Sequence, residues 1–259
     1  MRAPPKVDMS DAVLDIAGLV KRFGGLLATD QIDLRVQPME LHAVIGPNGA
    51  GKTTLIAQIA GNVIADSGRI QFAGTDITYL PPHRRVTLGL ARSFQITSIF
   101  HDMSVLDNVA LAVQAREGHS FRFFRPARSD SALRRPALQC LEQVGLGARA
   151  DVPASILSHG EKRLLELAIA LATQPRLLLL DEPMAGMGPD ESARMIALLS
   201  SLKGTFSMLL VEHDMDAVFA LADRITVLVY GRVIACGSPD EIRADEAVRR
   251  AYLGEETHS

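Results

Sequence analysis

The sequence lacks the long apolar runs and the cysteine clusters that define several classes of protein. No stretch approaches the ~20 apolar residues that a membrane-spanning helix needs. The first residues, MRAPPKVDMSDAVLD, lack the apolar core of a secretion signal. The only two cysteines, Cys140 and Cys236, are too far apart for a metal-binding motif. We therefore expect two reduced, partly buried thiols in a cytosolic protein that reaches any membrane through a partner.

Charge is not dominated by either sign. The 259 residues include 27 Lys and Arg and 30 Asp and Glu, for a formal net charge of −3. Because this balance provides no basic field, we expect no nucleic-acid partner and no bulk attraction to anionic lipid. One local exception is FRFFRPARSDSALRR at 121–135, rich in Arg and Phe. Contact with lipid or a partner is one interpretation, but the lack of a helical amphipathic period favours a solvated loop.

Three short apolar runs predict strands of a buried parallel sheet. They are LHAVI at 41–45, RLLLL at 176–180 and FSMLLV at 206–211. Runs this short without polar alternation are typical of strands covered on both faces. Helix-like segments follow at 52–60, 189–202 and 214–222. The alternation predicts a doubly wound α/β core, whose ligands bind beyond the carboxyl ends of the strands.

The first of these strand ends leads into a phosphate-binding loop, GPNGAGKTT at 46–54. Gly46, Gly51, Lys52 and Thr53 have the phosphate-loop spacing. Glycines let backbone N–H groups curl around phosphate oxygens. Lys52 can bridge the β- and γ-phosphates, and the Thr53 hydroxyl can ligate Mg²⁺. A chance glycine-rich turn is a poor alternative, because a predicted strand precedes the motif and a predicted helix follows it.

Acidic residues and a histidine follow the other two strands. Asp181, which follows the strand predicted at 176–180, can hold Mg²⁺ through water. The adjacent Glu182 can polarise an attacking water. The alternative is a solvated turn, which the nearby phosphate loop disfavours. Alone, His213 would be a structural histidine at a helix start. At the same edge of the sheet, a γ-phosphate contact is the better prediction.

Together with LSHGEKR at 157–163, these motifs resemble the ABC ATPases, the nucleotide-binding subunits of ATP-driven transporters. The resemblance covers nearly the whole chain, with the motifs in the family's order. It implies one α/β P-loop ABC ATPase domain over 1–259 with ATP and Mg²⁺ as cofactors. A core with a mixed or parallel sheet and N-terminal antiparallel strands is expected at about 1–95 and 176–259, and a helical subdomain at about 96–175.

The resemblance also implies a role for each motif residue. Phe23 matches the aromatic that stacks on adenine, although a core aromatic would look alike in sequence. Gln95 in RSFQ matches the Q-loop glutamine that senses Mg²⁺ and the attacking water. Ser158 and Gly160 match the signature, which faces the nucleotide of a second subunit with the positive end of a helix. The implied nucleotide contacts are Phe23, Gly46, Asn48, Gly49, Gly51, Lys52, Thr53, Thr54, Ser158 and Gly160; the metal contacts are Thr53, Gln95 and Asp181; and the catalytic residues are Glu182, His213 and Gln95.

Three residues depart from the family pattern. His159 replaces the second signature glycine, Glu161 replaces a glutamine, and Gly188 stands where many members have aspartate. A carboxylate at Glu161 is unfavourable near a γ-phosphate unless it points away. We transfer no D-loop role to Gly188.

The stretch between the core segments has helical patterns of its own. SVLD at 104–107 predicts a capping box, and SALRRPALQCLEQVGL at 131–146 predicts a second helix with a break or restart at Pro136. The apolar residues Ile96, Ile99 and Phe100 precede these helices. Packing under the helices and a groove for a permease are equally open interpretations.

A finer resemblance is to the ATPases of branched-chain (hydrophobic) amino acid importers. It rests on RFGGLLA at 22–28, ARSFQ at 91–95, DEPMAGMGP at 181–189 and VRRAYLGEE at 248–256. Urea-type importers have similar motifs, and other subunits recognise the substrate. The resemblance implies a location at the cytoplasmic face of the membrane, integral permease subunits, an indirectly associated solute-binding protein, and a second ATPase, paralogous or identical, packed head to tail.

Two other classes remain as alternatives. A soluble ABC-type ATPase acting on nucleic acid or ribosomes usually has long coiled-coil insertions or two cassettes in one chain, and this chain has neither. A non-hydrolysing ATP-binding protein would be expected if Glu182 were missing, and it is present.

Overall fold

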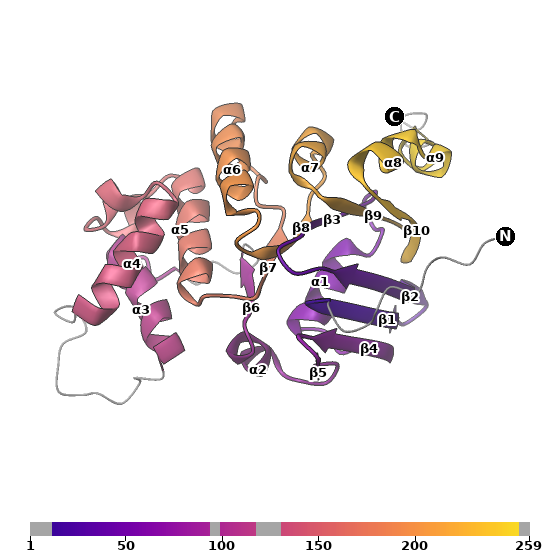
Figure 1. The fold of residues 1–259 in the computed structure, drawn as a ribbon, viewed down its shortest axis with the longest axis horizontal. Coiled ribbons are helices and arrows are strands. Elements are labelled where there is room, and N and C mark those ends of the chain that lie inside the picture. The colour runs from indigo at the N-terminus through magenta and orange to yellow at the C-terminus, as the bar shows by residue number, and fades with distance from the viewer. Residues whose placement is uncertain (1–11, 94–98, 118–130, 254–259) are drawn as a thin grey trace.

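The computed structural model describes residues 12–93, 99–117 and 131–253, and it contains two β-sheets flanked by helices (Figure 1). The strands are β1 (Leu14–Phe23), β2 (Leu26–Val36), β3 (Leu41–Ile45), β4 (Ser67–Phe72), β5 (Thr75–Asp76), β6 (Leu90–Ser93), β7 (Leu177–Asp181), β8 (Ser207–Val211), β9 (Arg224–Val229) and β10 (Arg232–Gly237). The helices are α1 (Lys52–Ala60), α2 (Pro82–Thr87), α3 (Val105–Glu117), α4 (Ser131–Gln143), α5 (His159–Ala172), α6 (Pro189–Leu202), α7 (Met215–Leu221), α8 (Pro239–Ala244) and α9 (Glu246–Leu253).

The larger sheet has the order β10-β9-β3-β8-β7-β6, and only β10 runs antiparallel to its neighbour. The three predicted strands are confirmed as β3, β7 and β8, within one residue at each end. The predicted helices after them are confirmed as α1, α6 and α7. The carboxyl ends of β3, β7 and β8 therefore lie at one edge, as the α/β prediction requires.

Alternate residues of the parallel strands face two different cores. On β7, Leu177 and Leu179 pack with α1 and the smaller sheet, whereas Leu178 and Leu180 pack with α5 and α6. All four side chains are fully buried. This two-sided burial explains why the strand reads as a continuous apolar run rather than an alternating one.

The smaller sheet is antiparallel, in the order β2-β1-β4-β5, and α1 lies between the two sheets (Figure 1). At the other end of α1, buried Arg85 from α2 donates to the carbonyls of Gln58 at 2.6 Å and Ile59 at 2.7 Å. Its guanidinium also donates to the carbonyls of Leu80 and Thr78. A cation at this end complements the negative pole of the helix that begins at the phosphate loop.

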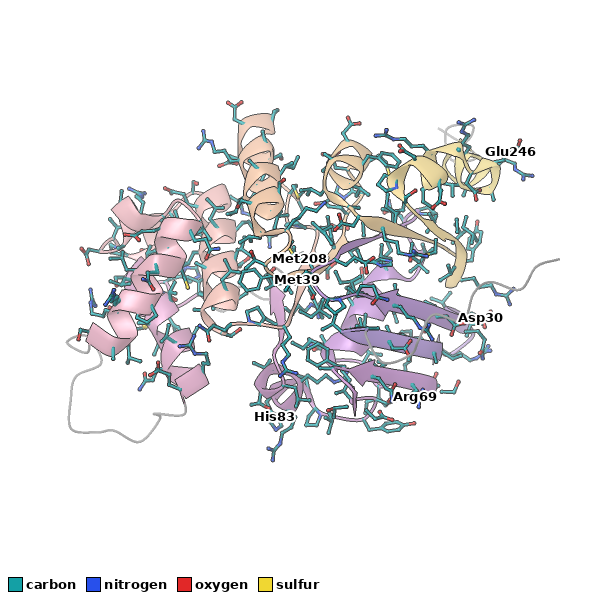
Figure 2. The ribbon with its side chains drawn as sticks, in the orientation of Figure 1. Asp30, Met39, Arg69, His83, Met208 and Glu246 are labelled. Atoms are coloured by element: carbon teal, nitrogen blue, oxygen red, sulfur yellow. The ribbon has the colours of Figure 1, made fainter. Side chains whose placement is uncertain are left out.

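The strands β3 and β8 are also tied together where they begin. The Met39 N–H donates to Ser207 Oγ at 2.9 Å, and the Met208 N–H donates to the Glu40 carbonyl at 2.9 Å. Figure 2 shows Met39 and Met208 side by side at this edge. These bonds fix the register of the strand that leads into the phosphate loop.

The helices α3, α4 and α5 pack together at one end of the molecule (Figure 1). Ser104 Oγ accepts the Asp107 N–H, but the Asp107 carboxylate pairs with Arg134, so only half of the predicted capping box is observed. The predicted break at Pro136 is wrong: α4 continues through this residue. Proline sits in the second turn, where few preceding backbone groups are affected, and the buried Leu133, Ala137 and Leu141 hold the helix on both sides of it.

Other local predictions have mixed outcomes. Ile99 is buried, whereas the Phe100 side chain is 58% exposed, so the apolar segment divides between core and surface. Both cysteines are free, as expected; Cys140 is partly buried but Cys236 is exposed, contrary to prediction. Ile96 and most of the Arg- and Phe-rich segment lie outside the described residues. Within the described ranges, no helix combines the length and apolar character required to cross a bilayer.

Candidate functional site

The phosphate loop joins β3 to α1 and leaves the start of that helix uncapped by any side chain. Gly51 occupies the N-cap position with φ 102°, a left-handed conformation that favours glycine. A Cβ there would lie 2.2 Å from the Ala28 carbonyl oxygen, so space as well as conformation requires glycine. The first turn of α1 has no acidic residue. The backbone N–H groups and the positive pole of α1 are thus directed at an anion site.

Lys52 is buried, and its ammonium group donates to the Gly46 carbonyl at 2.6 Å and the Pro47 carbonyl at 3.0 Å. The loop borders a cavity of about 230 Å³, which brings most of the predicted phosphate contacts together with Glu182. Its lining residues are Leu26, Ala28, Asn48, Gly49, Ala50, Gly51, Lys52, Thr53, Thr54 and Glu182. The site thus combines backbone donors, a lysine and hydroxyl groups, which is the chemistry that a polyphosphate requires.

Asp181 ends β7 on the face that packs against α1, and its carboxylate accepts a hydrogen bond from Arg92 of β6. The Arg92 Nη2 to Asp181 Oδ2 distance is 2.9 Å, and both side chains are mostly buried. Burial raises the pKa of the Asp181 carboxyl group, and the nearby Arg92 guanidinium opposes that rise. Carboxylate and hydroxyl oxygens suit Mg²⁺, which binds few protein groups and completes its shell with phosphate and water. The donor set of Asp181 and Thr53 therefore fits this ion.

Glu182 and His213 meet at the neighbouring strand ends. The His213 Nδ1 to Glu182 Oε1 distance is 4.0 Å, and both side chains are substantially exposed. Glu182 has φ 51°, which is uncommon for a residue other than glycine, and its N–H donates to the Val211 carbonyl at 2.8 Å. Glu182 is also one of the residues that line the cavity beside the phosphate loop.

A buried residue that the sequence analysis did not single out organises this edge. The Glu212 carboxylate is fully buried and accepts the N–H groups of Met184 at 3.1 Å and His213 at 2.9 Å. It therefore connects the segment after Glu182 to the segment that holds His213. Its position next to His213 was the available signal, but an acidic residue after a strand resembles an ordinary surface residue.

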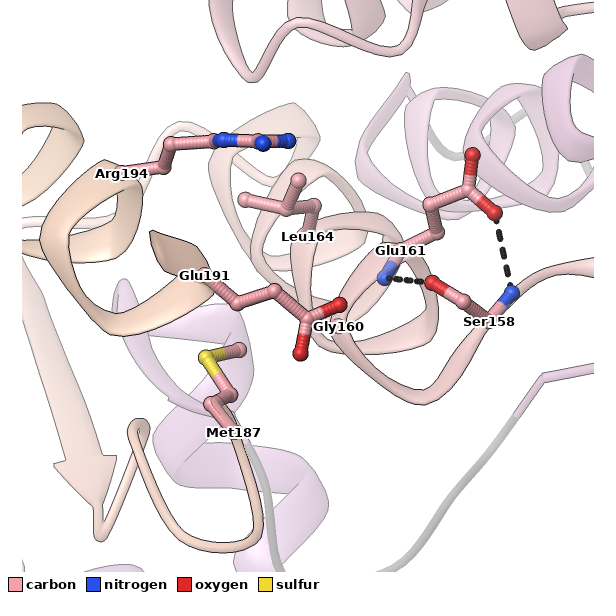
Figure 3. Close-up of a pocket in the computed structure, with 7 residues that line it drawn as sticks. All are labelled: Ser158, Gly160, Glu161, Leu164, Met187, Glu191 and Arg194. Carbon is pink, nitrogen blue, oxygen red and sulfur yellow. Dashed lines mark hydrogen bonds between the residues drawn. The ribbon is translucent and has the colours of Figure 1, made fainter. Parts of the chain in front are cut away.

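The signature residues begin α5 with a complete capping box. Ser158 Oγ accepts the Glu161 N–H at 3.2 Å, and the Glu161 carboxylate accepts the Ser158 N–H at 2.9 Å (Figure 3). Glu161 also pairs with Arg149 at 3.1 Å. The Glu161 carboxylate is therefore bonded within its own chain. This agrees with the expectation that a carboxylate at this position must point away from a γ-phosphate. The His159 and Gly160 N–H groups lie outside the capping box.

The signature packs against the segment that leads into α6. His159 Nε2 lies 3.3 Å from the Ala185 carbonyl oxygen. A Cβ on Gly160 would lie 2.4 Å from Glu191 Oε1, at the end of a flexible side chain that would have to move to admit it. A cavity of about 330 Å³ lies between the starts of α5 and α6. Figure 3 shows the residues that line it. Gly188 has no side chain to cap α6, and its N–H donates to the Glu191 carboxylate instead.

The structure gives less information about two predicted nucleotide or metal contacts, Phe23 and Gln95. Phe23 is 48% exposed, which excludes the alternative of a core aromatic, and it pairs with Leu26, a residue that lines the phosphate-loop cavity. Phe23 itself is not among the lining residues, and Lys21 lies 5.4 Å from the centre of its ring. Gln95 lies outside the described residues.

A phosphate loop after β3, two acidic residues at the end of β7 and a histidine after β8, the strand between them, define a P-loop ATPase cassette. A family model described as ABC transporter matches residues 29–185. The chain belongs to this family, and its α/β fold and ATPase class are as predicted. A second model, described as branched-chain amino acid ATP-binding cassette transporter, matches residues 232–258.

Relatives and solved structures agree with this assignment over nearly the full length. The chain is 38% identical over 254 residues to the high-affinity branched-chain amino acid transport ATP-binding protein BraF of Pseudomonas aeruginosa, covering 95% of this chain and 100% of that protein. It is also 38% identical over 257 residues to LivG of Escherichia coli, with the same coverage. The ADP conformation of MJ1267, an ATP-binding cassette of an ABC transporter, is 30% identical with a TM-score of 0.82, covering 94% of this chain and 99% of that one.

Proposed function

We propose that this chain is the ATP-hydrolysing subunit of an importer for branched-chain or other hydrophobic amino acids. The observation that supports this substrate class most directly is the match of residues 232–258 to the branched-chain amino acid cassette model. The names of the BraF and LivG relatives support the same class. ATPases of this kind work with membrane permease components. The subunit acts at the cytoplasmic face of the membrane, beside permease subunits and a second ATPase, and depends indirectly on a solute-binding protein.

The nucleotide binds at the start of α1. Backbone N–H groups of the phosphate loop and of the start of α1 surround the phosphates, and Lys52 exchanges its bonds to the Gly46 and Pro47 carbonyls for bonds to the β- and γ-phosphates. Phe23 stacks on the adenine from the exposed end of β1. Thr53 and Asp181 would hold Mg²⁺, with Gln95 as a further contact, and the ion would neutralise charge on the phosphates.

Hydrolysis depends on the pair at the next strand ends. Glu182 orients and polarises the attacking water, because its carboxylate borders the phosphate-loop cavity and is accessible to solvent. His213 contacts the γ-phosphate from the neighbouring strand end. The buried Glu212 carboxylate keeps the His213 backbone in place through the N–H bond between them.

The signature contributes to the site of a second ATPase subunit. The exposed Ser158 hydroxyl and the His159 and Gly160 N–H groups approach the γ-phosphate bound by that subunit, at the positive pole of α5. Two nucleotides between head-to-tail subunits close the dimer, and hydrolysis reopens it. The helical segment at about 96–175, with Phe100 exposed near Gln95 in sequence, receives the permease.

The first experiment is to tag the protein in its own cell, solubilise the membranes gently and identify what co-purifies. We expect hydrophobic permease subunits and a second ATPase, followed by loss of leucine, isoleucine or valine uptake when Glu182 is replaced by Gln in the cell. Retained amino acid uptake with loss of urea, amide or organic-acid uptake would move the substrate to another class. Recovery of only soluble partners, with the bait absent from membranes, would contradict the transporter role and favour a soluble ATPase.

A further inference from the structure

Among the described residues, Arg85 is buried and Arg92 is mostly buried on the side of the sheet that faces α1, and the two arginines are bonded in different ways. Arg85 uses Nε, Nη1 and Nη2 to donate to four backbone carbonyls. Arg92 has one ion pair, from Nη2 to Asp181 Oδ2 at 2.9 Å. Among the described residues, its Nε is buried and has no hydrogen-bond partner. Arg85 is thus bonded as a fixed structural cation, whereas the bonding of Arg92 is directed at one carboxylate.

The strand register explains why these two side chains meet. Arg92 of β6 pairs with Leu179 of β7, and paired residues of neighbouring strands share a face of the sheet. Asp181 is two residues beyond Leu179 and therefore lies on the same face. That face packs against α1, as Leu90 and Leu179 do. Arg92 and Asp181 consequently face the helix that begins at the phosphate loop.

The ion pair uses only one carboxylate oxygen. Arg92 contacts Asp181 Oδ2, and no described residue donates a hydrogen bond to Oδ1. A single-oxygen contact restrains the orientation of the carboxylate and leaves the other oxygen for a metal-bound water. The Arg92 and Asp181 side chains are 13% and 8% exposed, so solvent screens their attraction only weakly.

We propose that Arg92 is a positioning residue for the metal site: it orients Asp181 so that Oδ1 faces the Mg²⁺ held with Thr53. This inference rests on the proposed Mg²⁺ site. Partners that orient a metal ligand change metal affinity by ~10- to 100-fold when removed. Because Asp181 acts through water, we expect the lower end of that range.

The test measures nucleotide binding rather than turnover. ATP affinity is measured by calorimetry at low temperature, first in EDTA and then at increasing Mg²⁺. For Arg92→Met, we expect the Mg²⁺ concentration for half-maximal enhancement to rise ~10-fold, with ATP affinity in EDTA unchanged. Arg92→Lys keeps the charge and one donor and should stay within about 3-fold of the unsubstituted protein.

A matched control is Arg134→Met, which removes another arginine–aspartate pair, with a 3.2 Å contact to Asp107 in the helical segment. It should leave the Mg²⁺ requirement unchanged. An unchanged or lowered Mg²⁺ requirement in Arg92→Met, or an equal loss of affinity in EDTA, would overturn the positioning role. If the unsubstituted protein binds ATP equally well with and without Mg²⁺, the metal proposal itself fails.

Discussion

The helices α1 and α5 both begin at predicted phosphate contacts, but their first turns are built differently. At α1, Gly51 provides no side-chain cap and the first turn holds no acidic residue. At α5, Ser158 and Glu161 form a complete capping box, so the chain supplies its own carboxylate to the helix start. The positive pole of a helix stabilises an anion. At α1 that anion must come from a ligand, whereas at α5 the Glu161 carboxylate already provides a negative charge at the start of the helix.

This difference assigns different tasks to the two regions. The start of α1 has a lysine, a cavity and open N–H groups, so one subunit is equipped to bind nucleotide alone. At the start of α5, the capping box already uses the Ser158 and Glu161 N–H groups, so only the remaining backbone N–H groups can bind a phosphate. We infer that it contributes once a partner presents a nucleotide, not as an independent phosphate site.

Glu182→Gln tests whether binding at α1 is separable from hydrolysis. We expect hydrolysis to fall roughly 10²- to 10⁴-fold, the scale for a positioned proton acceptor, because the amide cannot polarise the water as the carboxylate does. ATP affinity should be unchanged, because the donors at α1 remain. The measurements are phosphate release and calorimetric ATP binding. Turnover near that of the unsubstituted protein would contradict the role of Glu182.

Arg85→Met tests the opposite end of α1. The substitution leaves the carbonyls of Gln58, Ile59, Leu80 and Thr78 without this donor. The Gln58 carbonyl keeps its bond from the Gly61 N–H. A buried carbonyl left without a donor costs about 1–3 kcal/mol before relaxation or hydration, so we expect the free energy of unfolding to fall by about 3 kcal/mol. Urea denaturation measures the change. The control is Arg84→Met on the exposed side of α2, which should stay within about 0.5 kcal/mol.

Burial also explains what the sequence could not predict about this molecule. The strands and the phosphate loop were predictable because apolar runs and glycine spacing are local signals. The partners of Arg85 and Arg92 were not, since they depend on contacts between separate segments. Arg92 pairs with Asp181, 89 positions later. Glu212 likewise bonds Met184, 28 positions earlier. The continuous α4 through Pro136 shows packing overriding a local breaking signal.

Ser158→Arg tests whether α5 needs a partner's nucleotide. The added side chain and charge should weaken ATP-dependent dimers by about 30-fold or more, the scale of a central interface residue, while the monomer still binds ATP. Size-exclusion light scattering with Glu182→Gln in the background measures dimers without turnover. Ser158→Ala is the control, because it removes the cap but adds no bulk and should cost ~1 kcal/mol of stability. Loss of ATP binding by the monomer would contradict the assignment of α5 to the partner's site.

Glu161→Gln produces the smallest expected change and addresses the comparison most directly. Glutamine can still accept the Ser158 N–H, so the capping box survives and stability should change by less than about 0.5 kcal/mol. The lost Arg149 pair is partly exposed and contributes little. Removing a negative charge from the first turn makes that turn more favourable for an incoming phosphate by ~0.3–1 kcal/mol. ATP-dependent dimers in the Glu182→Gln background should therefore tighten about 2- to 5-fold, most clearly at low salt. Weaker dimers would contradict this prediction. They would mean that the Glu161 carboxylate stabilises the closed dimer, instead of weakening the binding of the partner's phosphate to the start of α5.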